Sequence, residues 1–368
     1  MIPEMPILRA TPAIEAIPPM TPFIGPEQLM REGSHARLLR LGANESAFGP
    51  SPKAVAAMSA ELPHLSWYGD PESFALREAL AARFGCSLEN VCVGSGIDDL
   101  MGLVVRAFIG PGSVALATRG TYPTFAYHVT GFGGGLATVD YRADGFVDVD
   151  ALIRRTKSLR PSIVYLANPD NPSGTLLERG KVERLFDALP AQTLLLLDEA
   201  YADFVEAEAF LGPMIHSQLV RVRTFSKAYG MAGARIGFAI TTPRNVATFQ
   251  KIRLHYGVNR NAQVGAMAAL EDDAFVAHVV QEVARGRDDY YSLAASLGLG
   301  TIPSHTNFVC IDCGDGRTAT ALMETLLRRG VFIRKPALPP LEGYVRVTVG
   351  TPEERAQFAE HFRAVISG

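Results

Sequence analysis

The chain has 368 residues, of which 48% are hydrophobic and 20% are charged, and its formal net charge at pH 7 is -3. A chain of this length can bury a large core and exceeds one ordinary domain. The charge provides no basic surface for nucleic acid, so no nucleic-acid partner is expected.

The first forty residues are rich in proline, and residues 1–20 lack the basic start and the continuous apolar stretch of a signal peptide. We interpret 1–40 as an N-terminal arm that is either a disordered leader or packed on a partner subunit. The longest apolar runs, such as residues 194–197, are far shorter than the roughly 18 to 20 residues that a membrane span needs. We therefore expect a cytoplasmic protein without membrane association.

Short apolar runs alternate with helix-length segments from about Val91 onward. The runs are residues 91–93, 114–116, 163–166, 194–197 and 220–222. This alternation predicts an α/β fold with a mostly parallel sheet and helices on both faces. Ligands of such sheets bind at the carboxyl ends of the strands, and here polar or glycine-containing segments follow the runs at once. The chemistry is therefore expected to gather at one sheet edge.

The pattern changes beyond about Asn261. Long helical stretches come first, and the apolar runs 307–311, 331–334 and 344–348 follow. A smaller α+β domain fits this pattern best. The predicted division is an arm at 1–40, a large domain at 41–262 and a small C-terminal domain at 263–368.

The segment 94–99 is a candidate anion site. A strand ends in Gly94-Ser95-Gly96, and a helix begins whose apolar face is formed by Leu100, Leu103, Val104 and Phe108. A helix start of this kind presents free backbone N–H groups and a positive dipole end to an anion. The same turn can also merely join a strand to a helix, and it lacks the third glycine of a dinucleotide fingerprint.

Asp198 ends a run of four leucines, so its carboxylate should be partly desolvated and should need a cationic or proton-donating partner. The alternative is a buried cap residue. Tyr201 could donate its hydroxyl into the same site, although a tyrosine more often packs in a core.

Lys227 follows the next run and brings a primary amine to the same edge. Most lysines are solvated surface groups, but a lysine in a closed site beside another cation has a lowered pKa and readily forms imines with carbonyls. We expect Arg235 to be that cation, and its planar guanidinium could also bind a phosphate with two hydrogen bonds. Cys310 and Cys313 form a CxxC without a second CxxC or a histidine pair, so no metal site is expected.

Three motifs in this sequence resemble those of a known enzyme family. Residues 168–174 (NPDNPSG), 198–201 (DEAY) and 226–237 (SKAYGMAGARIG) resemble the pyridoxal-phosphate-dependent aminotransferases of fold type I, classes I and II, and most of all the histidinol-phosphate aminotransferase group. The similarity extends from residues 41–45 to residues 344–350. It implies the aspartate-aminotransferase-like fold, a large domain with a mostly parallel central sheet plus a smaller α+β domain, and pyridoxal 5'-phosphate as cofactor.

The resemblance also implies roles for the residues at the sheet edge. Lys227 would form a Schiff base with the cofactor and carry the proton between the substrate's α-carbon and the cofactor. Asp198 would pair with the protonated ring nitrogen, because a cationic ring is the better electron sink. Asn171 and Tyr201 would donate to the phenolic oxygen, and Tyr122 would stack on the ring.

The phosphate would be held by Ser226, by Arg235 and by the start of the helix, which comprises Ser95, Gly96, Ile97, Asp98 and Asp99 with backbone contacts from residues 97–99. Tyr68 resembles the tyrosine that reaches the cofactor phosphate of the neighbouring subunit. The resemblance therefore implies a homodimer with shared active sites.

The substrates implied are a small amino donor and a 2-oxo acid acceptor. Arg346 matches the arginine that clamps the substrate carboxylate, and Asn44 lies in the matching segment 41–45. Arg334 matches an arginine that contacts the substrate phosphate in histidinol-phosphate enzymes, while Phe23 stands where a tyrosine usually helps. The segment 255–260 is expected near the substrate pocket. Histidinol phosphate and an aromatic amino acid both remain possible donors.

Four other functions have to be weighed against the same residues. The cofactor chemistry could instead lead to decarboxylation of an amino-acid phosphate or to β-elimination by a C–S lyase. A cofactor-binding regulator usually needs a fused DNA-binding module, for which the N-terminal arm has no room. A nicotinamide oxidoreductase suits the sheet pattern, but the missing third glycine and the place of Lys227 argue against it.

Overall fold

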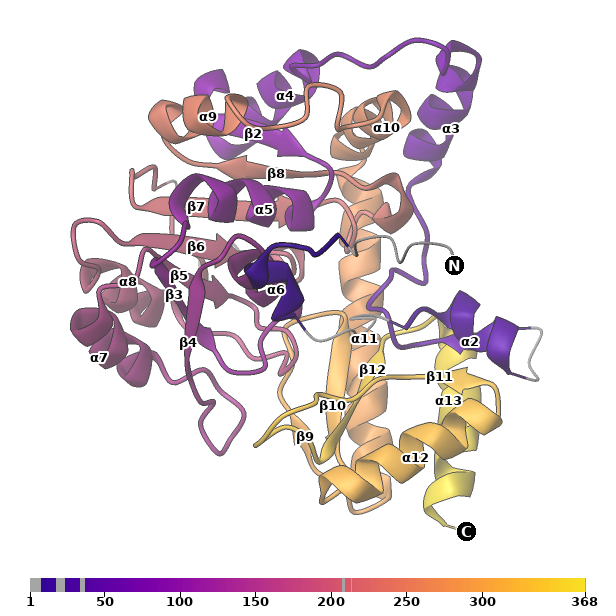
Figure 1. Cartoon of the computed structure of the whole chain (residues 1–368). Coiled ribbons are helices and arrows are strands. Elements are labelled where there is room, and N and C mark those ends of the chain that lie inside the picture. The colour runs from indigo at the N-terminus through magenta and orange to yellow at the C-terminus, as the bar shows by residue number, and fades with distance from the viewer. Residues whose placement is uncertain (1–7, 18–23, 34–36, 207–208, 213, 368) are drawn as a thin grey trace, which may run out of the picture.

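The structure is a computed structural model that describes residues 8–17, 24–33, 37–206, 209–212 and 214–367. Its centre is a seven-stranded sheet with the strand order β2-β8-β7-β6-β5-β3-β4 (Figure 1). The strands are β2 (Val91–Gly94), β3 (Val114–Thr118), β4 (Gly135–Val139), β5 (Ile163–Ala167), β6 (Leu194–Asp198), β7 (Leu219–Thr224) and β8 (Gly237–Ile240). In this sheet β8 is antiparallel to both of its neighbours, and the other pairs are parallel.

Both faces of the central sheet are covered, and β6 shows why its sequence is four consecutive leucines. Leu194 and Leu196 face the core shared with α5 (Ile97–Phe108), α6 (Pro123–Gly131) and α9 (Pro243–Gln250). Leu195 and Leu197 face the opposite core, to which α7 (Val149–Leu159) and α8 (Arg179–Asp187) contribute. Because successive side chains of a strand alternate between faces, a strand buried on both sides must be apolar throughout.

The second part of the fold is a three-stranded antiparallel sheet with the order β12-β10-β9. Its strands are β9 (Thr301–Ile302), β10 (Phe308–Asp312) and β12 (Tyr344–Thr348), and its helices are α12 (Gly316–Arg328) and α13 (Pro352–Ile366). The long helix α11 (Asp273–Ser296) runs from the central sheet to this smaller sheet (Figure 1). The short strand β1 (Leu39–Arg40) pairs in parallel with β11 (Val331–Phe332).

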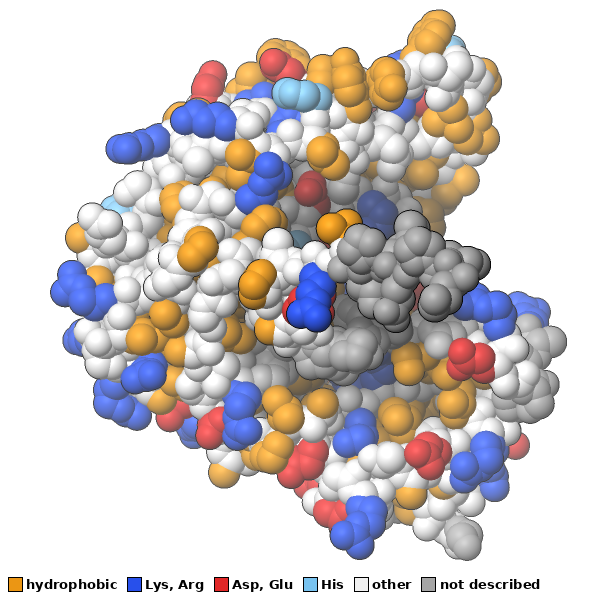
Figure 2. Space-filling view, in the orientation of Figure 1, with side chains coloured by type: hydrophobic (Ala, Val, Ile, Leu, Met, Phe, Trp, Pro, Cys, Tyr) orange, Lys and Arg blue, Asp and Glu red, His pale blue; other side chains and the backbone are white. Residues whose placement is uncertain are grey.

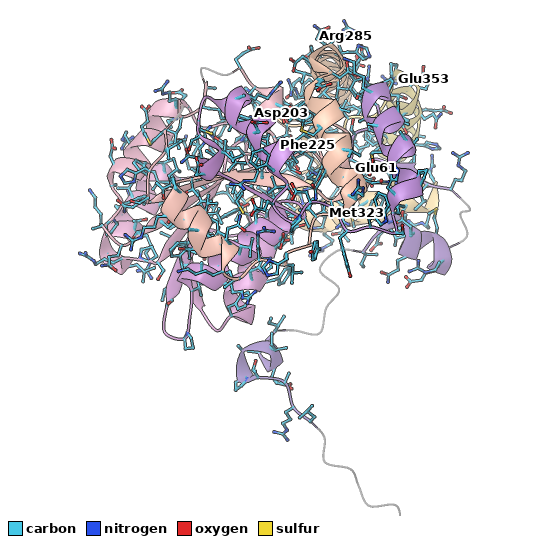
Figure 3. The ribbon with its side chains drawn as sticks, turned by 90° about the horizontal axis from the view of Figure 1, so that it is seen from above. Glu61, Asp203, Phe225, Arg285, Met323 and Glu353 are labelled. Atoms are coloured by element: carbon cyan, nitrogen blue, oxygen red, sulfur yellow. The ribbon has the colours of Figure 1, made fainter. Side chains whose placement is uncertain are left out.

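The remaining helices lie around these two sheets. They are α1 (Pro12–Glu15), α2 (Pro26–Glu32), α3 (Pro52–Glu61), α4 (Phe74–Phe84) and α10 (Arg260–Leu270), with 3-10 turns η1 (Leu62–His64), η2 (Leu88–Asn90), η3 (Ala202–Phe204) and η5 (Ala232–Ala234). Helix α3 packs on α10. Helix α1 contacts α6 and lies at the outside of the described part of the protein (Figure 3).

The mostly parallel sheet predicted from the sequence is confirmed, and each of the five predicted runs falls in one of its strands. Two strands, β4 and β8, were not predicted, because each is a short run that contains or begins with glycine. The domain boundaries at residues 40 and 262 stay a prediction. The structure does show that β1, from the predicted arm, pairs with β11 of the smaller part.

Membrane spans, metal sites and the CxxC can also be compared with the structure. No helix among the described residues is long and apolar enough to cross a membrane. In the same residues no group of three or more histidine, cysteine, aspartate or glutamate side chains could hold a metal ion. Within the CxxC, Cys310 is buried on β10 and its thiol donates to the carbonyl of Pro172 at 3.1 Å, so it packs against the loop that follows β5.

Candidate active site

A cavity of about 260 Å³ lies at the carboxyl ends of β5, β6 and β7, next to the start of α5. This is the sheet edge at which the sequence placed the chemistry. Its lining side chains are Ala43, Glu45, Ile97, Asp98, Tyr122, Ala167, Pro169, Asn171, Asp198, Ala200, Tyr201, Thr224, Ser226, Lys227, Ala232 and Arg235.

Asp198 forms one wall of the cavity and is 4% exposed. The hydroxyl of Tyr165 donates to its Oδ2 at 2.8 Å, and the backbone N–H of Ala200 donates to its Oδ1 at 3.0 Å. Burial raises the pKa of Asp198 to about 6, while the Tyr165 hydrogen bond acts to lower it. The proton-donating partner expected for this carboxylate therefore exists, and it is Tyr165.

Lys227 is partly buried and donates from Nζ to the carbonyl oxygen of Asn44 at 3.0 Å. Burial, together with the nearby charge of Arg346, lowers the pKa of Lys227 to about 8. The expectation that Arg235 would be this neighbouring cation was wrong. Arg346 comes from β12 of the smaller sheet, so no spacing in the sequence pointed to it.

Arg235 instead lies at the start of α5, with 46% of its side chain exposed. Its guanidinium is 3.3 Å from the carboxylate of Asp98 and 3.5 Å from the hydroxyl of Ser226. A Cβ on Gly96 would lie 2.6 Å from this guanidinium, and Gly96 has a positive φ of 88°. Only glycine leaves room for Arg235 to cross the helix start, where free N–H groups add positive potential.

The other predicted anion-site residues divide into two groups. Ile97 and Asp98 line the cavity, and the Tyr122 hydroxyl donates to Asp98 Oδ1 at 3.0 Å. The side chains of Ser95 and Asp99 do not line it. Ser95 donates its hydroxyl to the carbonyl of Gly257, and Asp99 accepts from the Ser95 backbone N–H at 2.9 Å. These two side chains shape the turn that precedes the helix.

Tyr201 is the centre of a hydrogen-bond network on the opposite wall. Its hydroxyl accepts from the amide Nδ2 of Asn44 at 2.9 Å and from that of Asn171 at 3.5 Å. Arg346 donates to Asn171 Oδ1 at 2.7 Å. Burial raises the pKa of Tyr201 to about 12, so the phenol keeps its proton at neutral pH and can act as a donor. The structure thus brings together four of the predicted residues.

Arg334 and Arg346 lie directly opposite each other in an antiparallel backbone bridge. The Arg346 N–H donates to the Arg334 carbonyl at 2.6 Å, and the Arg334 N–H donates to the Arg346 carbonyl at 3.2 Å. Neither side chain lines the cavity itself, but Arg346 reaches it through Asn171. Burial lowers the pKa of both guanidinium groups, and in Arg334 the charge of Arg346 adds to the effect.

Three predictions concern residues away from the cavity. Tyr68 is 76% exposed and stacks on Tyr256, with ring centroids 4.4 Å apart. Among the described residues, the segment 255–260 supplies no side chain to the lining of this cavity, and its place near the substrate pocket stays a prediction. Phe23 lies outside the described residues.

The sequence analysis missed Tyr165, Glu45 and Thr224. Glu45 and Thr224 line the cavity, and Thr224 accepts at Oγ1 from the backbone N–H of Ser226 at 3.0 Å. Tyr165 stands two residues before the end of β5, on the face of the sheet that carries Asp198. A polar ring at that position of a buried run was the available signal, but only the strand register tells which side chain it meets.

Comparisons with known proteins agree with this geometry. The sequence model of the family "Aminotransferase class I and II" matches residues 36–362. The histidinol-phosphate aminotransferase of Moorella thermoacetica is 31% identical over 363 residues, which cover 96% of this chain and 92% of that protein. The corresponding protein of Anaeromyxobacter sp. is 35% identical over 347 residues, covering 93% and 95%.

Solved structures give the same result. The crystal structure of histidinol-phosphate aminotransferase from Sinorhizobium meliloti in complex with pyridoxal-5'-phosphate superposes with a TM-score of 0.93 at 39% identity, over 98% of this chain and 99% of that one. An aspartate aminotransferase mutant from Thermus thermophilus superposes with a TM-score of 0.76 at 22% identity over 91% and 99%, a likeness of fold alone. The chain therefore belongs to the class I and II aminotransferase family and is a pyridoxal-phosphate-dependent aminotransferase.

Proposed function

We propose that this aminotransferase takes its amino group from histidinol phosphate and passes it to a 2-oxo acid. The observation that carries the proposal is the pairing of Arg334 with Arg346 across one backbone bridge. Like charges placed directly opposite each other on neighbouring strands destabilise a fold. An anion bound between the two would remove that cost, and a phosphate with nearly two negative charges does so better than a carboxylate. The names of the relatives support the same substrate.

The residues around the cavity fit pyridoxal phosphate. Lys227 is an amine whose lowered pKa of about 8 favours attack on a carbonyl. Asp198 offers a carboxylate to a ring nitrogen. The cofactor phosphate would bind at a positively polarised site formed by Arg235, Ser226 and the start of α5. When bound, the cofactor supplies an electron sink for the carbanion that forms at the substrate's α-carbon.

Each side chain then has one task. Lys227 Nζ would take the proton from the substrate's α-carbon and pass it on, and the carbonyl of Asn44 accepts from this amine at 3.0 Å and holds it in place. Tyr201 and Asn171 line the cavity and would donate to the phenolic oxygen of the cofactor, and Tyr122 would cover its ring. Arg346 orients the substrate's anionic group, as a planar two-pronged donor does well.

The substrate proposal is tested by single half-reactions of the cofactor-loaded enzyme, followed through its absorption spectrum. Histidinol phosphate and L-phenylalanine are the two donors, because phenylalanine carries one carboxylate and no phosphate. R334Q should slow the reaction of histidinol phosphate by about 10- to 100-fold, the size of one charged hydrogen bond. It should leave phenylalanine nearly unaffected, whereas R346Q should slow both.

R317Q is the matched control, because Arg317 is an exposed arginine at the start of α12. It removes the same charge and should change neither rate. Faster reaction of the wild type with phenylalanine than with histidinol phosphate would assign the enzyme to aromatic amino acids instead. Equal losses for both donors in R334Q would also contradict the proposal.

We also infer that the enzyme is a homodimer in which Tyr68 reaches the partner's phosphate site. Tyr68 belongs to an exposed apolar surface at one end of α3, and Figure 2 shows hydrophobic side chains gathered over this part of the molecule. A large exposed apolar surface usually marks an interface. The members of this surface are Leu62, Leu65, Trp67, Tyr68, Phe74, Leu254 and Tyr256, each about half exposed or more.

Subunit mixing tests the shared site. Co-expressed Y68F and K227A subunits form mixed dimers in which one site has an intact Lys227 from one chain and an intact Tyr68 from the other. Activity above that of either variant alone is the expected result. A monomer in analytical ultracentrifugation, or mixed dimers no more active than the Y68F homodimer, would contradict it. The cytoplasmic location stays a prediction from the sequence.

A further inference from the structure

Tyr165 has a contact that none of the roles above uses. It lies on β5 directly opposite Leu196 of β6, and Ala167 lies opposite Asp198. Side chains two residues apart on a strand share a face, so Tyr165 and Asp198 point to the same side of the sheet. The phenol is long enough to reach forward along the strands, and its hydroxyl meets Asp198 Oδ2 at 2.8 Å.

The phenol is held in this position by its packing. Tyr165 is 1% exposed, and its ring stacks on Phe125 of α6 with centroids 4.7 Å apart and planes 13° apart. The second oxygen of the carboxylate accepts from the backbone N–H of Ala200. Asp198 is thus held by two donors, one on each oxygen, and it lines the cavity.

We propose that Tyr165 is a positioning residue of the reaction, whose hydroxyl holds Asp198 as an oriented anion against the ring nitrogen of the cofactor. The inference rests on the role of Asp198 under the proposed function. The phenol touches neither substrate nor cofactor, so it acts entirely through the carboxylate.

The electrostatic surroundings of Asp198 explain why such a donor is needed. Burial and the carboxylate of Asp98 both act against the charged form of Asp198, and Lys227 favours it. The charge of Asp198 also acts on Tyr201, and Tyr122 and Asp170 act on the phenol of Tyr165. Burial raises the pKa of Tyr165 well above its usual value, so the phenol remains a donor. Without the Tyr165 hydroxyl, the Ala200 N–H would be the only group among the described residues that donates a hydrogen bond to the Asp198 carboxylate.

The chain contains a matched control for this contact. Tyr141 is a second buried tyrosine that donates to a buried carboxylate, that of Asp170, at 3.0 and 3.1 Å. Asp170 does not line the cavity. Y141F therefore removes the same hydroxyl from the same kind of pair without changing the carboxylate that faces the ring.

The experiment measures binding rather than turnover. Two ligands are titrated calorimetrically into the cofactor-free enzyme: pyridoxamine phosphate, which forms no bond to Lys227, and its analogue with carbon in place of the ring nitrogen. The readout is the ratio of their dissociation constants. We expect a ratio of about 10 or more in the wild type, as for one charged hydrogen bond. It should fall several-fold in Y165F and stay at the wild-type value in Y141F.

The variants separate the inference from the proposed function. D198N should bring the ratio close to one, and a ratio unchanged in D198N would overturn the role of Asp198 itself. If D198N lowers the ratio while Y165F weakens both ligands equally, the tyrosine is only structural and the inference is wrong. Fluorotyrosine at position 165 keeps the shape and is a stronger donor, so it should raise the ratio. A ratio that stays at or below the wild-type value with this residue would contradict the inference even if Y165F folded poorly.

Discussion

Two buried tyrosine–carboxylate pairs stand at the same edge of the central sheet and differ in how completely the carboxylate is bonded. Asp170 accepts from Tyr141 and from both the backbone N–H and the hydroxyl of Ser173 at 3.0 and 2.7 Å. Asp198 accepts from Tyr165 and one backbone N–H, and it borders the cavity. Burial raises the pKa of both to about 6. A fully bonded carboxylate stabilises its loop, whereas one with lone pairs facing a cavity is available for a ligand.

The largest difference between the two carboxylates should appear in the catalytic rate. D198N replaces the carboxylate facing the ring with a neutral amide, which cannot hold a proton on the ring nitrogen. We expect kcat/KM to fall by about 10²- to 10³-fold, the loss typical of one preorganised electrostatic contact. D170N should lower kcat/KM less. Asp170 does not line the cavity and can act on the reaction only through its neighbour Asn171, which does. Steady-state kinetics decides this, and equal losses would mean that both carboxylates act on the reaction alike.

Removal of Asp170 should reduce the stability of the fold more than removal of Asp198, which is the opposite of their order in catalysis. D170A removes the acceptor of two buried donors, the Ser173 N–H and the Tyr141 hydroxyl, whereas the Ser173 hydroxyl can turn to Thr175 Oγ1, 2.8 Å away. Each unpaired group costs about 1–3 kcal/mol. D198A should cost less, because water in the cavity can replace the lost oxygens. Urea denaturation of the cofactor-free protein measures both, and a greater loss for D198A would reverse the comparison.

The pH dependence of stability should reflect both carboxyls. Their pKa is about 6 in the folded protein and 3.8 as the reference value. The folded chain therefore binds more protons than the unfolded chain between these values, and their contribution to stability decreases as pH rises through this window. Denaturation curves between pH 4 and pH 6.5 should show a shallower fall for D170N and D198N than for the wild type. Slopes identical to that of the wild type would show that the carboxyls do not titrate there.

The smallest expected effect is the loss of stability when either tyrosine loses its hydroxyl, and it should be the same for both tyrosine–carboxylate pairs. Y165F and Y141F each delete one buried hydroxyl, and we expect each to lower the unfolding free energy of the cofactor-free protein by about 1 kcal/mol. Added cofactor should separate them, since only Y165F weakens the ligand's contribution to thermal stability. Melting curves with and without pyridoxal phosphate provide the measurement. A similar loss of ligand stabilisation in Y141F would remove the distinction between the pairs.

Much of this site could be predicted from the sequence. The apolar runs are long enough and continuous enough to be strands buried on both faces, and parallel strands bring their carboxyl ends to one edge. Asp198, Asn171, Ser226 and Lys227 each follow such a run within a few residues. Their closeness in space therefore follows from local pattern and from the parallel arrangement.

The contacts that set the charge states were decided by tertiary structure. The cation beside Lys227 is Arg346, which is 119 positions away in the chain (346 − 227) and belongs to the smaller sheet. The partner of Asp198 is Tyr165, which depends on the register of β5 against β6. A run of apolar residues fixes which face a side chain takes, because the strand period is two. It does not fix which neighbour lies opposite or which domain closes over the edge, because these depend on packing between segments far apart in the sequence.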